Sequence, residues 1–227
     1  MFKHSTKCSV MCFLICGAVT PSASAQDIDG TRVLAEQGDA QAQVLQGTIY
    51  DKGLGIPEDD GEAVRWYRKA AEQGYADGQL SLAFMYEYGS GLTKDDGEAV
   101  RWYRKAAEQG HVIAQSSLGI KYAEGEGVSK DDDEAVRWYR KAAEQGYAIA
   151  QFDLGFSYAL GEGIPEDDVE AMRWFRKAAE QGHAGAQYKL GESYANGTGV
   201  DQISLFHING FYSPLCTETQ MLKKQLK

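Results

Sequence analysis

Clusters of carboxylates are the side chains in this sequence with the clearest potential for chemistry. The clusters are Glu58–Asp60, Asp95–Asp96, Asp131–Asp133 and Glu166–Asp168. Adjacent carboxylates can hold a divalent cation, which prefers oxygen ligands. In every cluster, however, an aspartate stands three residues before a glutamate, as Asp59 stands before Glu62. This is the spacing of a capping box at a helix N-terminus, where negative charge is favourable. We therefore expect helix capping and no metal site.

Other candidates for catalysis or cofactor binding are few. His111 and His183 occupy the repeat position held elsewhere by Tyr75 and Tyr147, which favours a role in packing a turn. The sequence has no Ser-x-x-Lys, Gly-x-Ser-x-Gly or His-Glu-x-x-His motif. Its Gly-x-Gly turns lack the Lys-Ser/Thr of a P-loop, so no nucleotide or other cofactor is expected. These features favour a protein that is not an enzyme.

The first 25 residues have the order of regions found in a secretory signal peptide. Two lysines precede a largely apolar run at residues 10–19, and Ala23-Ser24-Ala25 offers a cleavage site. The apolar run is too short to span a bilayer, which takes about 20 residues. We expect cleavage after Ala25 and a secreted or periplasmic product without stable membrane insertion.

Charge and cysteine content restrict the partners and the sources of stability. The chain carries 33 acidic and 23 basic side chains and a net charge of −10 at pH 7. Such a surface repels a phosphate backbone, so binding to nucleic acid is not expected. Cys8, Cys12 and Cys16 lie in the predicted signal peptide, which leaves Cys216 alone in the exported product. No intramolecular disulfide is then possible, and stability must come from packing. Cys216 either forms an intermolecular disulfide or is incidental.

Four tryptophans mark a repeat with a period of 36 residues. They are Trp66, Trp102, Trp138 and Trp174. Each lies in nearly the same segment, which reads GEAVRWYRKAAEQG at both 61–74 and 97–110. A fixed period of this size indicates an array of units that stack on their neighbours. The elements that position the carboxylate clusters and the histidines are therefore those of a repeat array.

Each unit divides into an A half and a B half, and each half predicts one helix of about 13 residues, or about 20 Å. In the A half, a leucine and a tyrosine four residues apart, such as Leu118 and Tyr122, share a helical face. In the B half, Trp66 and Tyr67 share a stripe with three alanines, which indicates packing between helices rather than a stack for a ligand. The A halves begin near Ala40, Ala76, Val112, Ala148 and Ala184.

These residues resemble the Sel1-like repeat family, whose members are related to the tetratricopeptide repeat. The resemblance rests on Leu118-Gly119 with Tyr122, on the Gly-x-Gly-Val at 125–128, and on the Ala-x-x-Trp-Tyr-x-Lys-Ala-Ala-Glu-Gln-Gly that follows. It covers roughly residues 31–200 and recurs four to five times. The resemblance implies an all-α fold, a right-handed α-α superhelix (solenoid) of antiparallel helix pairs. It also implies a role as an adaptor or scaffold in protein complexes.

The array departs from its own pattern at both ends. Residues 32–38 match only the last turns of a B helix, and residues 26–38 are expected to form a partial helix or cap. Residues 39–200 hold four full units and a fifth that lacks its second helix. In the first unit Gln46 replaces the A-half leucine, as expected where an outer face has no neighbour. Residues 201–227 carry no repeat signature and form either a capping helix or a remnant of truncation.

Variable positions in the A halves predict where a partner binds. The B halves are almost identical, whereas several A-half positions differ from unit to unit. In tetratricopeptide-like arrays the A helices line the concave face, so this variation falls where a partner would lie, although relaxed constraint would leave the same record. The candidate partner-binding residues are Ser81, Phe84, Met85, Ser117, Ile120, Lys121, Asp153, Phe156, Ser157, Lys189 and Glu192.

The sequence favours an exported adaptor that holds a peptide or a folded protein in its concave groove. An alternative is a cell-envelope accessory that hydrolyses β-lactams or peptidoglycan, or that binds glycans. Some cysteine-rich proteins of the resembled family have been associated with β-lactam hydrolysis, but this chain lacks their paired cysteines. A further alternative is a non-functional, truncated copy of a longer array.

Overall fold

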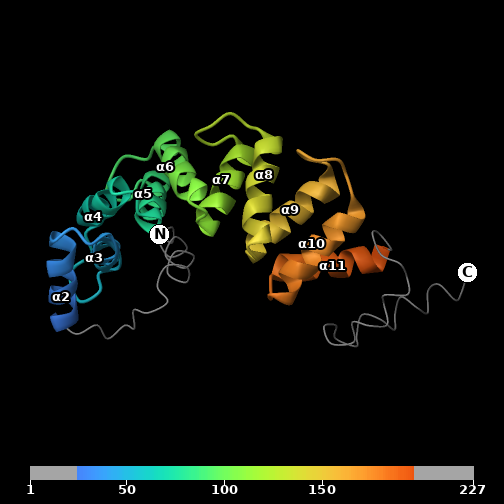
Figure 1. Ribbon diagram of the computed structural model, residues 1–227. Coiled ribbons are helices and arrows are strands. Elements are labelled where there is room, and N and C mark those ends of the chain that lie inside the picture. The colour runs from blue at the N-terminus through green and yellow to red at the C-terminus, as the bar shows by residue number, and fades with distance from the viewer. Residues whose placement is uncertain (1–24, 197–227) are drawn as a thin grey trace, which may run out of the picture.

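The protein is an arch of α-helices (Figure 1). The computed structural model describes residues 25–196, and all regular structure in this range is helical. The helices are α2 (Ala25–Glu36), α3 (Ala40–Lys52), α4 (Asp60–Glu72), α5 (Ala76–Tyr88), α6 (Asp96–Glu108), α7 (Val112–Glu124), α8 (Asp132–Glu144), α9 (Ala148–Leu160), α10 (Asp168–Glu180) and α11 (Ala184–Asn196). The predicted all-α fold is confirmed. Residues 1–24 of the predicted signal peptide and the tail with Cys216 lie outside the described residues.

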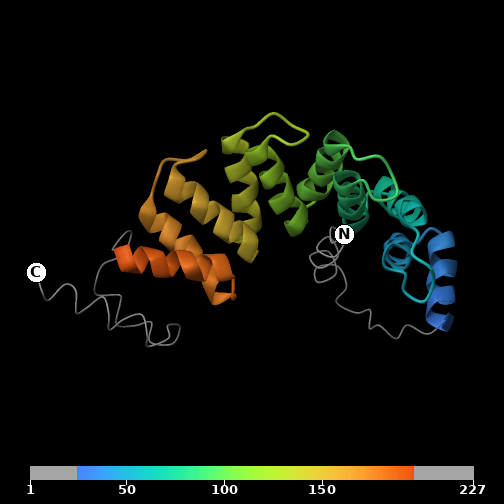
Figure 2. The ribbon, with the colours of Figure 1, turned by 180° about the vertical axis from the view of Figure 1, so that it is seen from behind.

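Helix pairs repeat along the arch in chain order, as the view from behind also shows (Figure 2). The A helices are α3, α5, α7, α9 and α11, and the B helices are α4, α6, α8 and α10. Each helix packs against the one before it and the one after it, which confirms the predicted superhelix of stacked pairs. No helix within residues 25–196 has the length and apolar character needed to cross a membrane.

The carboxylate clusters cap the B helices, as predicted. Asp95 Oδ1 accepts a hydrogen bond of 3.0 Å from the backbone N–H of Glu98. The second half of the expected capping box is absent, because Glu98 Oε1 instead accepts a bond of 2.9 Å from Arg101. The backbone N–H of Asp95 donates to the carbonyl oxygen of Tyr86 at 3.0 Å, which ties the start of α6 to α5. The same aspartate caps recur at Asp59, Asp131 and Asp167.

The tryptophans form the packing spine of the array. Trp66, Trp102 and Trp138 are each 8% exposed, and Trp174 is 9% exposed. The ammonium group of a lysine three residues further on lies over each indole, as Lys105 Nζ lies 3.8 Å from the ring centroid of Trp102. The prediction that these rings pack between helices is confirmed.

A buried glutamine in the A helix connects three consecutive helices. Gln115 Nε2 in α7 donates to the carbonyl oxygen of Ala107 in α6 at 3.1 Å. Its Oε1 accepts a bond of 2.7 Å from Gln145 Nε2 at the C-terminus of α8. Because both ends of the buried amide are satisfied, the group fixes the three helices relative to one another without a desolvation penalty. Equivalent bonds occur at Gln43, Gln79 and Gln151.

The loops from A to B helices also join neighbouring units. Gly125 ends α7 with a φ of 72°, and Gly127 follows with a φ of 70°. A Cβ atom on Gly127 would lie 2.1 Å from the carbonyl oxygen of Asp96, the first residue of α6. Positive φ and close backbone approach both require glycine at this position. The loop therefore packs one unit directly against the preceding one.

At the N-terminal end, α2 is longer than the sequence pattern at residues 32–38 indicates. It spans Ala25–Glu36 and packs against α3. Gln46 of α3 is only 1% exposed, so the expectation that it marks an uncovered outer face is wrong. The helices around α3 enclose this side chain.

Candidate partner-binding surface

One face of each A helix remains accessible to solvent, and we call it the open stripe. Its members are spaced three or four residues apart, as Ser117, Ile120 and Glu124 are in α7, so they share one helical face. The open stripe consists of Leu45, Phe84, Tyr88, Ser117, Ile120, Glu124, Ile149, Asp153, Phe156, Leu160, Lys189 and Glu192. These side chains come from five successive A helices.

The candidate partner-binding residues divide into accessible and buried groups. The accessible ones lie on the open stripe and are Phe84, Ser117, Ile120, Asp153, Phe156, Lys189 and Glu192. The others are Ser81, Met85, Lys121 and Ser157, which are 0%, 2%, 4% and 8% exposed. The buried group lies beneath the surface, between packed helices. A role in partner binding stays a prediction for the whole set.

Exposed apolar side chains gather on the A helices. Tyr88, Ile149 and Leu160 of the open stripe are 44%, 37% and 55% exposed. Tyr88 also stacks on Phe84, with 6.2 Å between the ring centroids. Outside the A helices, Val33 and Leu34 of the terminal helix α2 and Val169 of the B helix α10 are also exposed. Apolar side chains gathered on one face are typical of a protein-binding surface, whereas isolated ones are normal.

A buried lysine forms an internal ion pair network between the second and third units. Lys121 Nζ lies 2.6 Å from Glu87 Oε1 and 2.7 Å from Glu126 Oε2. The Tyr103 hydroxyl donates a hydrogen bond to the other oxygen of Glu87. Burial lowers the pKa of Lys121, but its hydrogen bonds to Glu126 and Glu87 outweigh that effect and raise the pKa overall. The lysine is therefore a charged part of the packing in this unit.

One unit further along the array, the corresponding space is a cavity of about 190 Å³. It is lined by Ala123, Asp132, Ala135, Tyr139, Asp153, Phe156, Ser157 and Glu162, and we call it the Asp153 cavity. Asp153 Oδ2 has no contact with solvent and no hydrogen-bond partner. Burial raises the pKa of Asp153 to about 7. Burial also raises the pKa of the Tyr139 hydroxyl. The cavity thus holds a carboxylate whose charge is not compensated.

The two histidines of the array cap A helices. His111 Nδ1 accepts a bond from the backbone N–H of Ala114, and Nε2 lies 3.1 Å from Asp77 Oδ1. That hydrogen bond lowers the pKa of Asp77. His183 Nδ1 accepts a bond of 3.2 Å from the N–H of Ala186, and burial lowers the pKa of His183. The prediction that both residues pack at turns is confirmed. Within residues 25–196 no group of three or more His, Cys, Asp or Glu could hold a metal ion.

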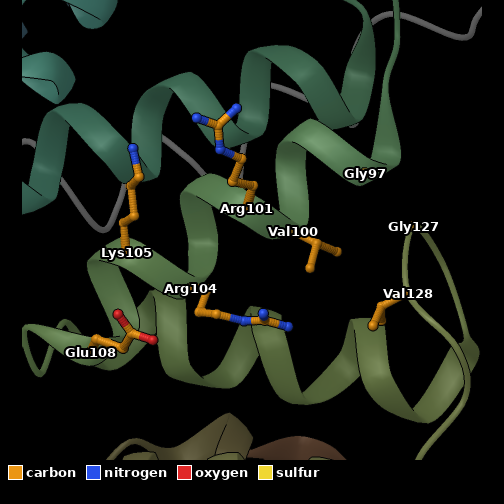
Figure 3. Close-up of a pocket in the computed structure, with 8 residues that line it drawn as sticks. All are labelled: Gly97, Val100, Arg101, Arg104, Lys105, Glu108, Gly127 and Val128. Carbon is orange, nitrogen blue, oxygen red and sulfur yellow. The ribbon is translucent and has the colours of Figure 1, made fainter.

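A second cavity, of about 340 Å³, lies between α6 and the loop after α7. Figure 3 shows Arg104 extending toward Val128, whereas Arg101 and Lys105 point in a different direction. Each cation already has a partner. Arg101 pairs with Glu98, Arg104 donates to the Tyr122 hydroxyl at 2.6 Å, and Lys105 lies over Trp102. This arrangement repeats along the B helices and indicates structural use of the cations rather than an anion site.

Sequence reasoning missed several residues around Lys121 and the Asp153 cavity. Glu87, Glu126, Tyr139 and Glu162 were not among the candidates, because the pattern within one helix does not show which residues of adjacent units meet. A signal was present, since Glu87 aligns with Ala123 at the 36-residue period. Comparing the residues at equivalent repeat positions in adjacent units, rather than the residues within one helix, would have indicated the site.

Stacked antiparallel helix pairs, linked by the same buried glutamine in successive units, define the class of α-solenoid repeat proteins. The Sel1 repeat model matches residues 40–75, 76–111, 112–147, 148–183 and 184–204. The chain therefore belongs to the Sel1 repeat family, which confirms the resemblance seen in the sequence. No curated protein matches it.

Solved structures with the same architecture come from several bacteria. A protective antigen of uropathogenic Escherichia coli strains, which displays an SLR fold, is 42% identical with a TM-score of 0.75, over 76% of this chain and 37% of that one. A Sel1 repeat protein from Oxalobacter formigenes is 41% identical with a TM-score of 0.73, over 78% of this chain and 72% of that one. An immunity protein from Pseudomonas aeruginosa, 22% identical with a TM-score of 0.51, covers 79% of this chain and 65% of that one, and shares the fold. The chain thus spans well under half of the Escherichia coli protein.

Proposed function

We propose that this protein is an exported adaptor that holds a peptide or a folded protein against the open stripe of its A helices. The observation that carries this proposal is the gathering of exposed apolar side chains on that stripe, including Tyr88, Ile149 and Leu160. The B helices instead expose charged residues, such as Arg101 and Arg137, that are already paired with glutamates. Sel1 repeat proteins are generally scaffolds for protein interactions, which supports the same function.

Export is the second part of the proposal. The predicted cleavage site after Ala25 coincides with the first residue of α2, so cleavage would leave the helical array nearly whole. The Escherichia coli neighbour is described as a protective antigen, which is in keeping with an exported product. Expression of the full chain in a bacterial host, followed by N-terminal sequencing of the periplasmic or secreted product, tests this part. We expect Gln26 as the first residue, and an uncleaved cytoplasmic product would contradict export.

Partner binding is tested by affinity capture from the exported compartment. Ile120→Glu and Leu160→Glu place charge on the open stripe, where both side chains are accessible. The matched control is Arg137→Glu, which changes an exposed residue of the B helix α8. We expect the two stripe variants to lose a partner that wild type and the control retain. Loss in the control alone, or equal capture by all four proteins, would contradict the proposed surface.

The alternative of a hydrolase gains no support from the two histidines of the array, since both serve as helix caps. A truncated, non-functional copy predicts a poorly folded product. Circular dichroism during heating distinguishes that alternative, because the stacked helices described above should melt in a cooperative transition.

A further inference from the structure

We infer that the Asp153 cavity is a receptor for a lysine side chain that the bound protein partner supplies. The inference deepens the proposed function and rests on it, because the lysine must come from the partner on the open stripe. Two members of that stripe, Asp153 and Phe156, also line the cavity, so it opens within the same surface.

The preceding unit shows what occupies the equivalent space. Lys121 of the third unit aligns with Ser157 of the fourth, and Glu126 aligns with Glu162. In the third unit, the Lys121 ammonium lies 2.7 Å from Glu126. In the fourth unit the glutamate is retained while the lysine is replaced by a short serine, and the cavity of about 190 Å³ results. The array thus contains both a filled and an empty form of one site.

The negative charge around the space is maintained although the lysine is lost. Glu87, which binds Lys121 from α5, aligns with Ala123, so one carboxylate disappears. Ser117 aligns with Asp153, so one carboxylate appears on the other side of the space. Asp153 and Glu162 therefore provide two carboxylates, as Glu87 and Glu126 do one unit earlier. No lysine or arginine, however, lines the cavity between them. Asp153 Oδ2 is consequently buried without a hydrogen-bond partner.

The lining of the cavity matches both parts of a lysine side chain. Asp153 of α9 and Glu162 of the loop after α9 supply acceptors for an ammonium group. Asp132 of α8 also lines the cavity, but its Oδ1 already pairs with Lys130 at 3.3 Å. The ring of Phe156 offers an apolar wall for the methylene stem, since lysine buries its stem and keeps its charge hydrogen-bonded. The volume lies below the roughly 300 Å³ at which pockets for small organic ligands begin. A single side chain fits that size.

Binding of Nα-acetyl-lysine amide to the full chain tests the inference directly. Side-chain carboxyl signals of ¹³C-labelled aspartate report on Asp153 in an NMR titration, and Nα-acetyl-norleucine amide is the neutral control probe. We expect a saturable shift of the Asp153 signal with the lysine probe and none with norleucine. No saturable shift with either probe, or equal shifts with both, would overturn the inference.

Two variants and a matched control locate the effect. Asp153→Asn keeps the shape of the side chain and should weaken the lysine probe about tenfold or more, because it removes one charged acceptor. Ser157→Lys should fill the cavity from within, as Lys121 does one unit earlier, and abolish binding. Asp133→Asn removes the same charge from an exposed position of α8 outside the lining and should bind as wild type does. Equal affinity in Asp153→Asn and Asp133→Asn would contradict the site, even if Ser157→Lys failed to fold.

Partner capture separates this inference from the proposed function. If Asp153→Asn fully retains a partner that binds the open stripe, the result would contradict the lysine receptor and would leave the adaptor function supported. If the lysine probe binds but no partner is captured, the result would support the lysine receptor and contradict the adaptor function. Loss of the partner in Asp153→Asn, with retention in Asp133→Asn, supports both.

Discussion

Asp153 is a residue whose ionisation opposes folding. Its pKa is raised to about 7 by burial, whereas an aspartate in an unfolded chain titrates near 3.8. Between these values the native state binds more protons than the unfolded state, so the free energy of unfolding decreases as pH rises. The titratable groups around Asp153 are Asp132 and Tyr139 of α8, Tyr147 before α9 and Glu162 of the loop after α9. Asp132 pairs with Lys130 at 3.3 Å, and no lysine or arginine lines the cavity itself.

Asp153→Asn should therefore flatten the pH dependence of stability between about pH 4 and pH 7. A shift of about three pKa units corresponds to at most about 4 kcal/mol. We expect the variant to equal wild type at low pH and to exceed it above pH 7, as measured by urea denaturation at a series of pH values. His183, whose pKa is lowered by burial, titrates in both proteins and cancels in the comparison. A constant difference at all pH values would contradict the assignment.

A second prediction at the scale of single residues concerns the stability that Trp102 provides. Its indole is 8% exposed, so Trp102→Ala should leave a cavity between units and cost roughly 3–5 kcal/mol. The lysine above the ring serves as control, since Lys105→Ala removes a partly exposed cation–π contact worth about 1 kcal/mol or less. Chemical denaturation measures both. An unchanged midpoint for Trp102→Ala would place the ring outside the core.

At the scale of elements, the loops after the A helices carry the tightest contacts between units. Gly127→Ala forces a Cβ to within 2.1 Å of a backbone oxygen of α6, in addition to a φ of 70°. Gly110→Ala is a matched control, because Gly110 has a φ of 90° but no atom within 4 Å of the added Cβ. The control should cost about 1–2 kcal/mol from backbone strain alone.

Gly127→Ala should cost clearly more than Gly110→Ala and should also separate the second and third units. Thermal melting measures the first effect, and hydrogen exchange across α6 and α7 measures the second. Equal losses in the two variants would mean that strain, and not the contact with Asp96, explains the glycine.

The elements were largely predictable because local and repeated signals agree. The aspartate caps, the glycine stops and the apolar stripe of Trp66 and Tyr67 recur in successive units, so each predicted helix was supported several times. Contacts that depend on three helices together were not predictable in this way. The partner of Glu98 is a clear case, since the capping-box spacing does not reveal that Arg101 competes for its carboxylate. The burial of Gln46 likewise depends on how neighbouring helices close around it.

The candidate site was only partly predictable for a related reason. Variation between units drew attention to Asp153 and Lys121, but it could not separate accessible side chains from buried ones. Ser117 and Ser81 occupy the same repeat position, yet Ser81 is fully buried and Ser117 is not. Helical periodicity alone therefore does not determine exposure at this position.

The whole molecule combines two surfaces of different character. Its B helices form a nearly invariant spine in which tryptophans are covered and exposed charges are paired. Its A helices vary along the open stripe and expose apolar groups around one uncompensated carboxylate. A repeat array can separate stability from recognition in this way, because each unit contacts only its neighbours.

Site-specific photo-crosslinking in the exported compartment tests the central claim most directly. A photoreactive phenylalanine derivative placed at Phe156 lies on the open stripe, and the same group placed at Arg137 lies on the exposed side of α8. The adaptor function predicts a discrete crosslinked product from position 156 and none from position 137. A product of the same size from both positions, or from position 137 alone, would contradict the assignment of the open stripe as the partner-binding surface.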